Sequence, residues 1–166
     1  MRPTVVITTD VELIRDLALR TWPVTFGEIL SAAQIAYMLE LMYAPAALRE
    51  QMQQRGHVFL LARDEAGEAR GYVSYQLDYR PGTTKVHKLY VLPEGQGGGY
   101  GRALVEAVAK TARAAGQQRL RLDVNYQNPA IGFYERLGFA KVDEVTTEIG
   151  EGYLMEDYVY ERALSS

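Results

Sequence analysis

A cluster of glycines between a strand pattern and a helix pattern constrains this chain more than any other feature. Five of the seven residues at positions 95–101 are glycine. An apolar segment at residues 89–92 precedes them and ends at Pro93, and an amphipathic helix pattern follows. Without Cβ atoms, several backbone N–H groups can converge on one point, where the helix dipole adds positive potential. The cluster therefore predicts a strand–loop–helix unit that binds phosphate oxygens.

Two common phosphate-binding motifs do not match this loop. A P-loop would end in Gly-Lys-Ser or Gly-Lys-Thr, and Arg102-Ala103 stands there instead. The dinucleotide fingerprint also fails, because its glycine spacing differs and no first βαβ unit surrounds the loop. The plain alternative is a flexible connector, but a connector has no need to begin a helix at its last glycine.

The composition indicates one globular domain over residues 1–166, with 48% apolar and 23% charged residues. The net charge of −3 gives no basic footprint and argues against a nucleic-acid partner. The absence of cysteine excludes disulfides, thiolate metal sites and a cysteine nucleophile. His57 and His87 lie far apart in sequence and form no metal-ligand pattern, so we expect no metal. No stretch resembles a leader or a membrane span, which predicts a cytoplasmic protein with no membrane partner.

The first 56 residues read as a short strand followed by helices. Residues 5–7 are a β-branched run. Thr9 and Ser31 each stand three residues before a Glu or Gln, which predicts a capping box at the start of each of two amphipathic helices. Pro45 opens a further helical segment. Residues 1–56 are therefore expected to form a helical region.

From Val58 onward the pattern predicts strands at residues 58–62, 71–77 and 84–92, and, after the glycine loop and its helix, at 120–124. Asn128 is expected to cap a second helix in this half, with Pro129 in its first position and Gly138 after its end. Residues 139–145 and 153–159 read as a closing antiparallel pair. The order predicts a single mixed sheet of the α/β (α+β) class, flanked by helices.

The loop, read as Gln-x-x-Gly-x-Gly after Leu-Tyr-Val-x-Pro-Glu, resembles the cofactor motif of the GNAT superfamily of N-acetyltransferases. A second segment, residues 128–139, resembles another motif of that family: an asparagine near a helix start, then Ala, an aromatic–Tyr pair and Leu-Gly-Phe. The resemblance is strong over residues 84–140. It implies the acyl-CoA N-acyltransferase fold, a mostly antiparallel sheet splayed at its parallel central strands. It also implies acetyl-CoA as cosubstrate and a small-molecule primary amine as acceptor.

The resemblance further implies which residues hold acetyl-CoA. Strand backbone would contact the pantetheine arm, and loop amides would surround the pyrophosphate. The family asparagine commonly sits where this chain has Gln127, so its neighbours on both sides stay candidates. The implied cofactor residues are Leu89, Tyr90, Val91, Gln96, Gly97, Gly98, Gly99, Tyr100, Gly101, Arg102, Asn125 and Asn128.

Tyr134 falls on the position that many family members use as the general acid. Taken alone it reads as a core residue that carries a hydroxyl. The departing thiolate has a pKa of about 8.5 and tyrosine about 10, so full proton transfer is uphill by roughly 2 kcal/mol in water, which a positioned donor can offset. Many members carry a glutamate base where this chain has His87. Strand alternation puts His87 on the face of Leu89 and Val91, as a base or as an ordinary sheet residue.

The amine-binding wall is expected in the helical region, from an aromatic surface with a carboxylate. The candidates are Trp22, Phe26, Glu28 and Tyr37. Thr25-Phe26, Tyr37 and residues 156–159 are similar to the bacterial polyamine N-acetyltransferases. Amino-acid, antibiotic and protein N-terminal amines remain alternative acceptors.

Direct attack of the amine is favoured over a covalent acyl-enzyme, since neither a cysteine nor a serine–histidine motif is present. A non-catalytic acyl-CoA sensor is the first alternative, although a sensor has no use for the Tyr134 hydroxyl. A structural or interaction domain is the second. A homodimer stays open.

Overall fold

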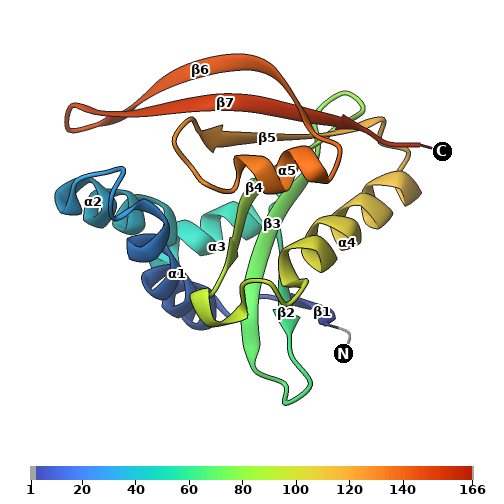
Figure 1. Ribbon diagram of the computed structural model, residues 1–166, viewed down its shortest axis with the longest axis horizontal. Coiled ribbons are helices and arrows are strands. Elements are labelled where there is room, and N and C mark those ends of the chain that lie inside the picture. Colours follow the sequence, from blue (N-terminus) through green and yellow to red (C-terminus); the bar gives the residue numbers. More distant parts are fainter. Residues whose placement is uncertain (1–2, 166) are drawn as a thin grey trace.

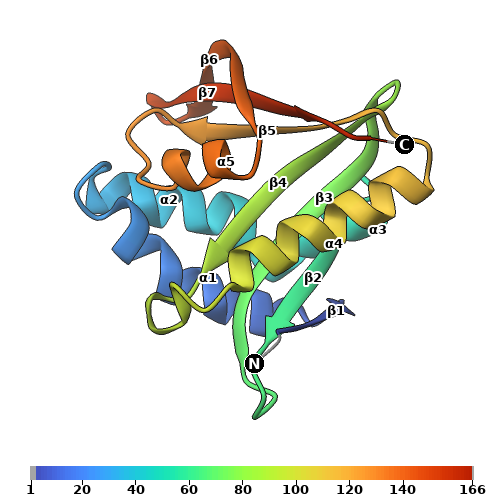
Figure 2. The ribbon, with the colours of Figure 1, turned by 45° about the vertical axis from the view of Figure 1, so that its right-hand side comes forward.

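The computed structural model describes residues 3–165, which form a seven-stranded sheet with helices on both faces (Figures 1 and 2). The strands lie in the order β1-β2-β3-β4-β5-β7-β6, and only β4 and β5 are parallel. The mixed, mostly antiparallel sheet predicted from the sequence is thus confirmed. The elements are β1 (Thr4–Thr8), α1 (Val11–Phe26), α2 (Ala32–Tyr43), α3 (Pro45–Gln53), β2 (Val58–Arg63), β3 (Ala69–Arg80), β4 (Thr83–Val91), α4 (Tyr100–Ala114), β5 (Arg119–Asn125), α5 (Ile131–Arg136), β6 (Ala140–Gly150) and β7 (Tyr153–Ala163).

The two parallel strands pair over only four residues and then diverge. Their register runs from Thr83↔Arg119 to Val86↔Leu122 and stops there. On its other edge β4 carries a bulge: Val86 pairs with Tyr75 and Lys88 with Ser74, so His87 has no partner on β3. Figure 2 shows β4 and β5 turning away from each other. The sheet is therefore splayed at the carboxyl ends of its central strands, as the resemblance implied.

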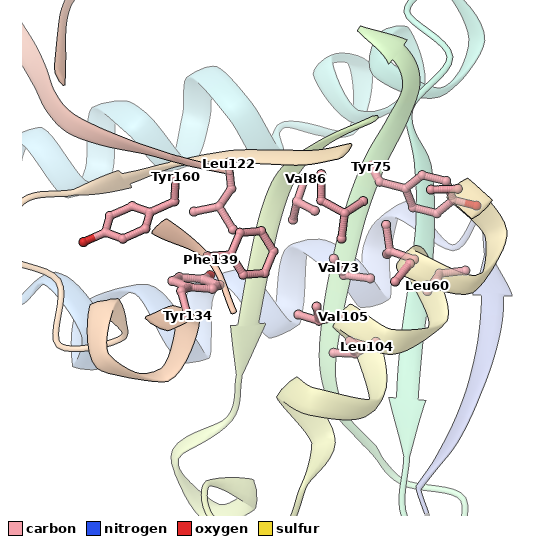
Figure 3. Close-up of a cluster of buried hydrophobic side chains, with 14 of the residues drawn as sticks. Leu60, Val73, Tyr75, Val86, Leu104, Val105, Leu122, Tyr134, Phe139 and Tyr160 are labelled. Carbon is pink, nitrogen blue, oxygen red and sulfur yellow. The ribbon is translucent and has the colours of Figure 1, made fainter. Parts of the chain in front are cut away.

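Each face of the sheet has its own apolar core. On one face, α4 and α5 pack on the strands with fully buried side chains such as Leu104 and Val105 (Figure 3). On the other face, α1, α2 and α3 cover a second cluster that includes Ile14, Leu48 and Leu61. The alternating strands supply both clusters, because successive side chains point to opposite faces.

Several predicted element boundaries are confirmed and others are wrong. Ser31 caps α2, its Oγ accepting a bond of 3.1 Å from the Gln34 amide. The first helix is capped by Asp10 instead of Thr9, since the Asp10 carboxylate accepts from the Leu13 amide. Either side chain fits an N-cap, so sequence preference alone could not separate these neighbours.

The second motif's helix starts later than expected. Asn128 accepts a bond of 2.8 Å from the Ala130 amide and so closes a turn. Helix α5 begins at Ile131, with Ala130 as its N-cap, and neither Asn128 nor Pro129 lies in the predicted position. Gly138 follows the helix with φ of +93°, the left-handed conformation expected after a helix end.

The closing strands are longer than predicted, because β6 extends to Gly150 and β7 to Ala163. Almost every residue of β6 is exposed, so its sequence lacks the alternation by which a strand is recognised. Within residues 3–165, no helix has both the length and the apolarity needed to cross a membrane.

Candidate active site

The glycine loop forms a turn between β4 and α4, as predicted. A 3₁₀ turn spans Pro93–Gly95, and Gly99 is the N-cap of α4 with φ of +83°. Gly97 also has a positive φ, of +85°. An L-residue rarely adopts this conformation, so these two positions require glycine on backbone grounds.

The loop and the first turn of α4 leave backbone donors free for an anion. The amides of Gln96 and Gly98 bond to carbonyls within the turn, at 3.3 and 3.1 Å. Those of Tyr100, Gly101 and Arg102 belong to a helix start, where no intrahelical acceptor exists. No atom lies within 4 Å of where a Cβ would stand at Gly97 or Gly99, so this side of the loop is open. These residues fit a pyrophosphate, as acetyl-CoA requires.

Gly101 has a different role, at the contact between α4 and α5. A Cβ there would lie 3.1 Å from Cζ of Phe133, which is closer than ordinary packing allows. Gly101 thus lets the two motif helices approach each other, and so places α5 beside the glycine loop.

A cavity of about 600 Å³ lies where β4 and β5 diverge. Leu89 and Tyr90 line it from β4, and Asn125 lines it from the end of β5. Val91 lies outside the lining and packs against the core on the α4 side. Since β4 has no partner on β5 beyond Val86, its backbone along this edge is open to a bound molecule.

Tyr134 lines the same cavity from α5. Its ring packs edge-on against Phe133 and Phe139, with centroid separations of 5.4 and 5.8 Å, as Figure 3 shows for Phe139. Only 6% of the residue is exposed, and burial raises its pKa. The hydroxyl is therefore protonated at neutral pH and lies beside the cavity.

The amide side chains near the second motif separate into two groups. Asn125 and Asn128 both line the cavity, whereas Gln127 does not. The Asn125 side chain also accepts a bond of 2.9 Å from the Gln127 amide, and Asn128 closes the turn before α5. Each carbonyl oxygen is thus engaged in the turn while the residue borders the cavity.

The structure places His87 at the cavity, but on the opposite face from the one predicted. The bulge at His87 breaks the alternation, so its ring lies on the side of the sheet covered by α1–α3 and not with Leu89 and Val91. Its Nε2 lies 2.9 Å from Oε1 of Gln76. Burial, followed by neighbouring His57 and lysine side chains, lowers the pKa of His87 to about 2. So low a proton affinity weakens the case for His87 as the base.

His57, which no sequence pattern connects with His87, stacks on it with ring centroids 4.0 Å apart and planes inclined by 15°. Burial and nearby Lys88 lower the pKa of His57 to about 4, so both rings are neutral at pH 7. Lys88 is 8% exposed, and its Nζ donates to Gln51 at 2.7 Å. Burial lowers the pKa of Lys88 to about 7.

Asp157 is a cavity residue that the sequence did not single out as a site. It lies on β7, paired with Asn125 of β5, and is 7% exposed. Burial, reinforced by nearby Asp123, raises the pKa of its carboxyl to about 6. No local sequence pattern marks Asp157 as a site residue. Its place beside the end of β5 depends on the insertion of β7 between β5 and β6.

Two of the four predicted amine-binding residues reach the cavity. Trp22 and Phe26 line it, with ring centroids 4.7 Å apart. Glu28 is exposed and lies outside the lining. Tyr37 also lies outside it, and its hydroxyl donates to the Ile149 carbonyl at 2.6 Å. Glu28 follows the end of α1, and Tyr37 lies within α2. Sequence position alone did not show which side of these segments faces the cavity.

Known proteins are similar to this chain in sequence and in structure. Residues 12–139 match the model of the acetyltransferase (GNAT) family. Mycothiol acetyltransferase of Salinispora arenicola is 42% identical over 88 residues, covering 50% of this chain and 29% of that protein. The L-methionine sulfoximine/L-methionine sulfone acetyltransferase of Pseudomonas aeruginosa is 39% identical over 92 residues, 52% of each protein. The chain thus spans about half or less of the length of these curated relatives.

The fold comparison agrees. The paia N-acetyltransferase of Thermoplasma acidophilum, solved in complex with coenzyme A, superposes with a TM-score of 0.80 over 98% of this chain and 99% of that one, at 22% identity. The splayed mixed sheet of this chain thus has the acyl-CoA N-acyltransferase fold. The chain belongs to the acetyltransferase (GNAT) family, which confirms the resemblance of the two motifs.

Proposed function

We propose that this protein transfers the acetyl group of acetyl-CoA to the primary amine of a small molecule, by direct attack. One observation carries the proposal: the unpaired edge of β4 and the side chain of Tyr134 border one cavity at the divergence of β4 and β5, and the open glycine turn follows β4 directly in the chain. Acetyl-CoA supplies the thioester whose carbonyl the amine attacks. Both curated relatives are acetyltransferases by name, which supports the reaction class.

The residues divide the work between the two ends of the cofactor. The amides at Gly97 and Gly99 and those of the first turn of α4 hold the pyrophosphate, and Arg102 adds charge from the exposed side. The open edge at Leu89 and Val91 holds the pantetheine arm. Asn125 and Asn128 border the path between them.

Tyr134 is the general acid in this proposal. It stands at the cavity with its hydroxyl protonated, ready to give a proton to the sulfur that departs. His87 contributes to the acceptor wall, because its lowered pKa makes it a poor proton acceptor. Trp22 and Phe26 supply the apolar part of that wall.

Thiol release from acetyl-CoA, measured over a panel of primary amines with product masses, tests the proposal. We expect acetylated product from at least one small amine, with one thiol released per acetyl transferred. Tight acetyl-CoA binding without turnover on any amine would instead favour a sensor. A melting temperature that acetyl-CoA leaves unchanged would rule out both and favour an interaction domain.

A further inference from the structure

The charged side chains of the cavity point to the kind of acceptor that fits it. Among residues 3–165, five charged side chains line the cavity, and three of them already have an opposite partner. Arg55 binds Glu50 at 2.7 Å, and Lys85 binds Asp123, which also lines the cavity, at 3.3 Å. Two charges remain without an opposite partner, one of each sign.

Asp157 is the free negative charge. Burial and then Asp123 raise its pKa, and Lys85 lowers it. Lys85 is already paired with Asp123. Within the described residues its carboxylate has neither an ion-pair partner nor a hydrogen-bond donor. The residue is 7% exposed and neither of its oxygens is sealed from the cavity, so a donor that enters the cavity can reach the carboxylate.

Lys88 is the free positive charge. Its ammonium donates to the neutral amide of Gln51 and lies over the rings of Tyr43 and Phe59, 5.6 and 5.5 Å from their centroids. These contacts orient the amino group and supply no opposite charge, so an anion that enters the cavity can pair with its protonated form. The stacked His57 and His87 rings are neutral and lie beside it, with Nδ1 of His57 buried and without a hydrogen-bond partner.

The two free charges line the same cavity from different strands, Asp157 from β7 and Lys88 from β4. In the part of the chain that the structure describes, no ion pair joins them, and the ammonium of Lys88 donates to Gln51 instead. The pKa of Lys88 responds to burial and to Arg55, and Asp157 is not among the groups that shift it. Asp157 and Lys88 therefore do not neutralise each other.

We propose that the acceptor is a small dipolar molecule whose primary amine binds Asp157 and whose carboxylate binds Lys88. The inference rests on the acetyl transfer proposed above and names the substrate class of that same cavity. Apolar side chains of Trp22, Met38 and Met155 line the space and suit a carbon chain between the two charges. A polyamine fits poorly, because it would bring a second cation towards Lys88 with a single free carboxylate to hold it.

The chemical step balances with these residues. Asp157 accepts one proton from the bound ammonium and later releases it to solvent. The nitrogen lone pair forms the C–N bond as the C–S bond of the thioester breaks. The Tyr134 proton goes to sulfur, and the second proton lost by nitrogen restores the Tyr134 hydroxyl. One amide, one thiol and one free proton result.

The test compares matched acceptors with acetyl-CoA present. Each L-amino acid, represented by L-methionine and L-phenylalanine, is assayed beside its carboxamide and its decarboxylated amine, with spermidine as the polyamine. We expect at least one carboxylate-bearing amine to exceed both of its analogues by about tenfold or more in kcat/KM, as one charged contact would give. Lys88→Met should remove that preference, so that the amino acid and its carboxamide have similar kcat/KM values in the variant.

Binding supplies a readout apart from turnover. Calorimetric titration of the best amino acid into the coenzyme A complex should show affinity lost in Asp157→Asn and Lys88→Met. It should persist in the controls Asp143→Asn and Lys110→Met, which change exposed residues on β6 and α4. Coenzyme A affinity, unchanged in all four variants, shows that each variant is folded.

The outcomes separate the two proposals. Turnover that favours the carboxamides, the simple amines or spermidine overturns the dipolar acceptor and leaves acetyl transfer standing. Amino-acid binding that survives Asp157→Asn also overturns it. Absence of turnover on every amine, with coenzyme A bound, overturns acetyl transfer itself and the dipolar acceptor with it.

Discussion

At the scale of single residues, burial divides the titratable groups of the cavity by their protonation at neutral pH. Tyr134 keeps its proton because burial raises its pKa, and the two histidines stay neutral because burial lowers theirs. Asp157 lies between these extremes, with a pKa of about 6. A proton donor and a proton acceptor thus line one cavity. Acyl transfer to an amine that arrives protonated needs both, one to deprotonate the nitrogen and one to protonate the leaving group.

Replacing Tyr134 by phenylalanine should lower kcat by roughly 100-fold, since a positioned acid contributes that much or more. The ring stays packed on Phe133 and Phe139, so the fold and acetyl-CoA affinity should be retained. Steady-state kinetics with direct measurement of acetyl-CoA binding checks this. Tyr153→Phe, at the start of β7 and outside the cavity lining, is the matched control. An unchanged kcat in Tyr134→Phe would exclude Tyr134 as the acid.

The pH dependence of kcat/KM should distinguish the two candidate bases. Asp157 faces Asp123 of β5, Lys85 and Tyr90 of β4, and its pKa of about 6 predicts that activity falls as the pH drops through 6. His87→Ala should retain this acidic limb, because the pKa of His87, about 2, lies far below it. A limb that flattens in His87→Ala would return the role of base to His87.

Lys88 should make stability rise with pH. Its pKa is about 7 in the folded chain and 10.5 in the unfolded one, so between these values the unfolded chain binds more protons. The free energy of unfolding then increases as the pH rises from 7 towards 10.5, by up to about 1.4 kcal/mol per pH unit. Urea unfolding of the wild type and Lys88→Met at pH 7 to 9.5 checks this, with Lys110→Met as control. Parallel curves for all three proteins would contradict a buried, destabilised ammonium.

At the scale of elements, two local distortions prepare the site. The bulge in β4 turns His87 and Lys88 to the same face of the sheet, and it coincides with the point where β4 leaves β5. The glycine turn delivers the start of α4 to the same edge. Bulges are enriched beside active sites because an extra residue re-aims side chains without ending the strand.

Gly99→Ala should separate backbone strain from ligand binding. Gly99 and Gly67 have φ values of +83° and +84°, and a Cβ at either meets no atom within 4 Å. Alanine should therefore cost each about 1 kcal/mol of stability. Gly67 lies in the β2–β3 turn, away from the loop, so only Gly99→Ala should also weaken acetyl-CoA binding. Thermal unfolding and calorimetry measure the two effects. Equal acetyl-CoA affinity in both variants would exclude the proposed phosphate site.

At the scale of the whole molecule, the cavity lies between the two halves of the chain. Helices α1–α3 line one part of it, the proposed acceptor wall, and β4, β5 and α5 line another, the proposed cofactor side. A ligand placed there contacts elements that the splayed sheet has left apart. Binding should consequently stabilise distant segments together.

Acetyl-CoA should slow amide hydrogen exchange at residues 87–91, 97–102 and 123–134 in parallel, because one molecule bridges the diverging strands. At 100 times its dissociation constant it should add about 2.7 kcal/mol to the free energy of unfolding. Exchange measured by mass spectrometry, with exposed β6 as an internal control, checks this. Protection confined to residues 97–102 would indicate that only the phosphates bind.

The sequence by itself determined most of the elements and the family, and it predicted the cofactor side. The glycines, the helix signals and the alternating strands are local patterns, and the two motifs lie within short segments, so the loop and Tyr134 could be proposed as site residues directly. Helix caps were placed less well where adjacent residues, such as Thr9 and Asp10, are equally suited to the position.

Only the tertiary structure brought together the side chains of the proposed acceptor side. Asp157 and Lys88 come from strands β7 and β4, and His57 precedes β2, so nothing local in the sequence joins them. The strand order brings these side chains to one cavity, and a bulge puts His87 on the face opposite to the expected one. Burial then shifts the pKa values of Asp157 and Lys88. Those are long-range effects, because a charge becomes significant for binding only when the fold removes it from water and withholds a partner.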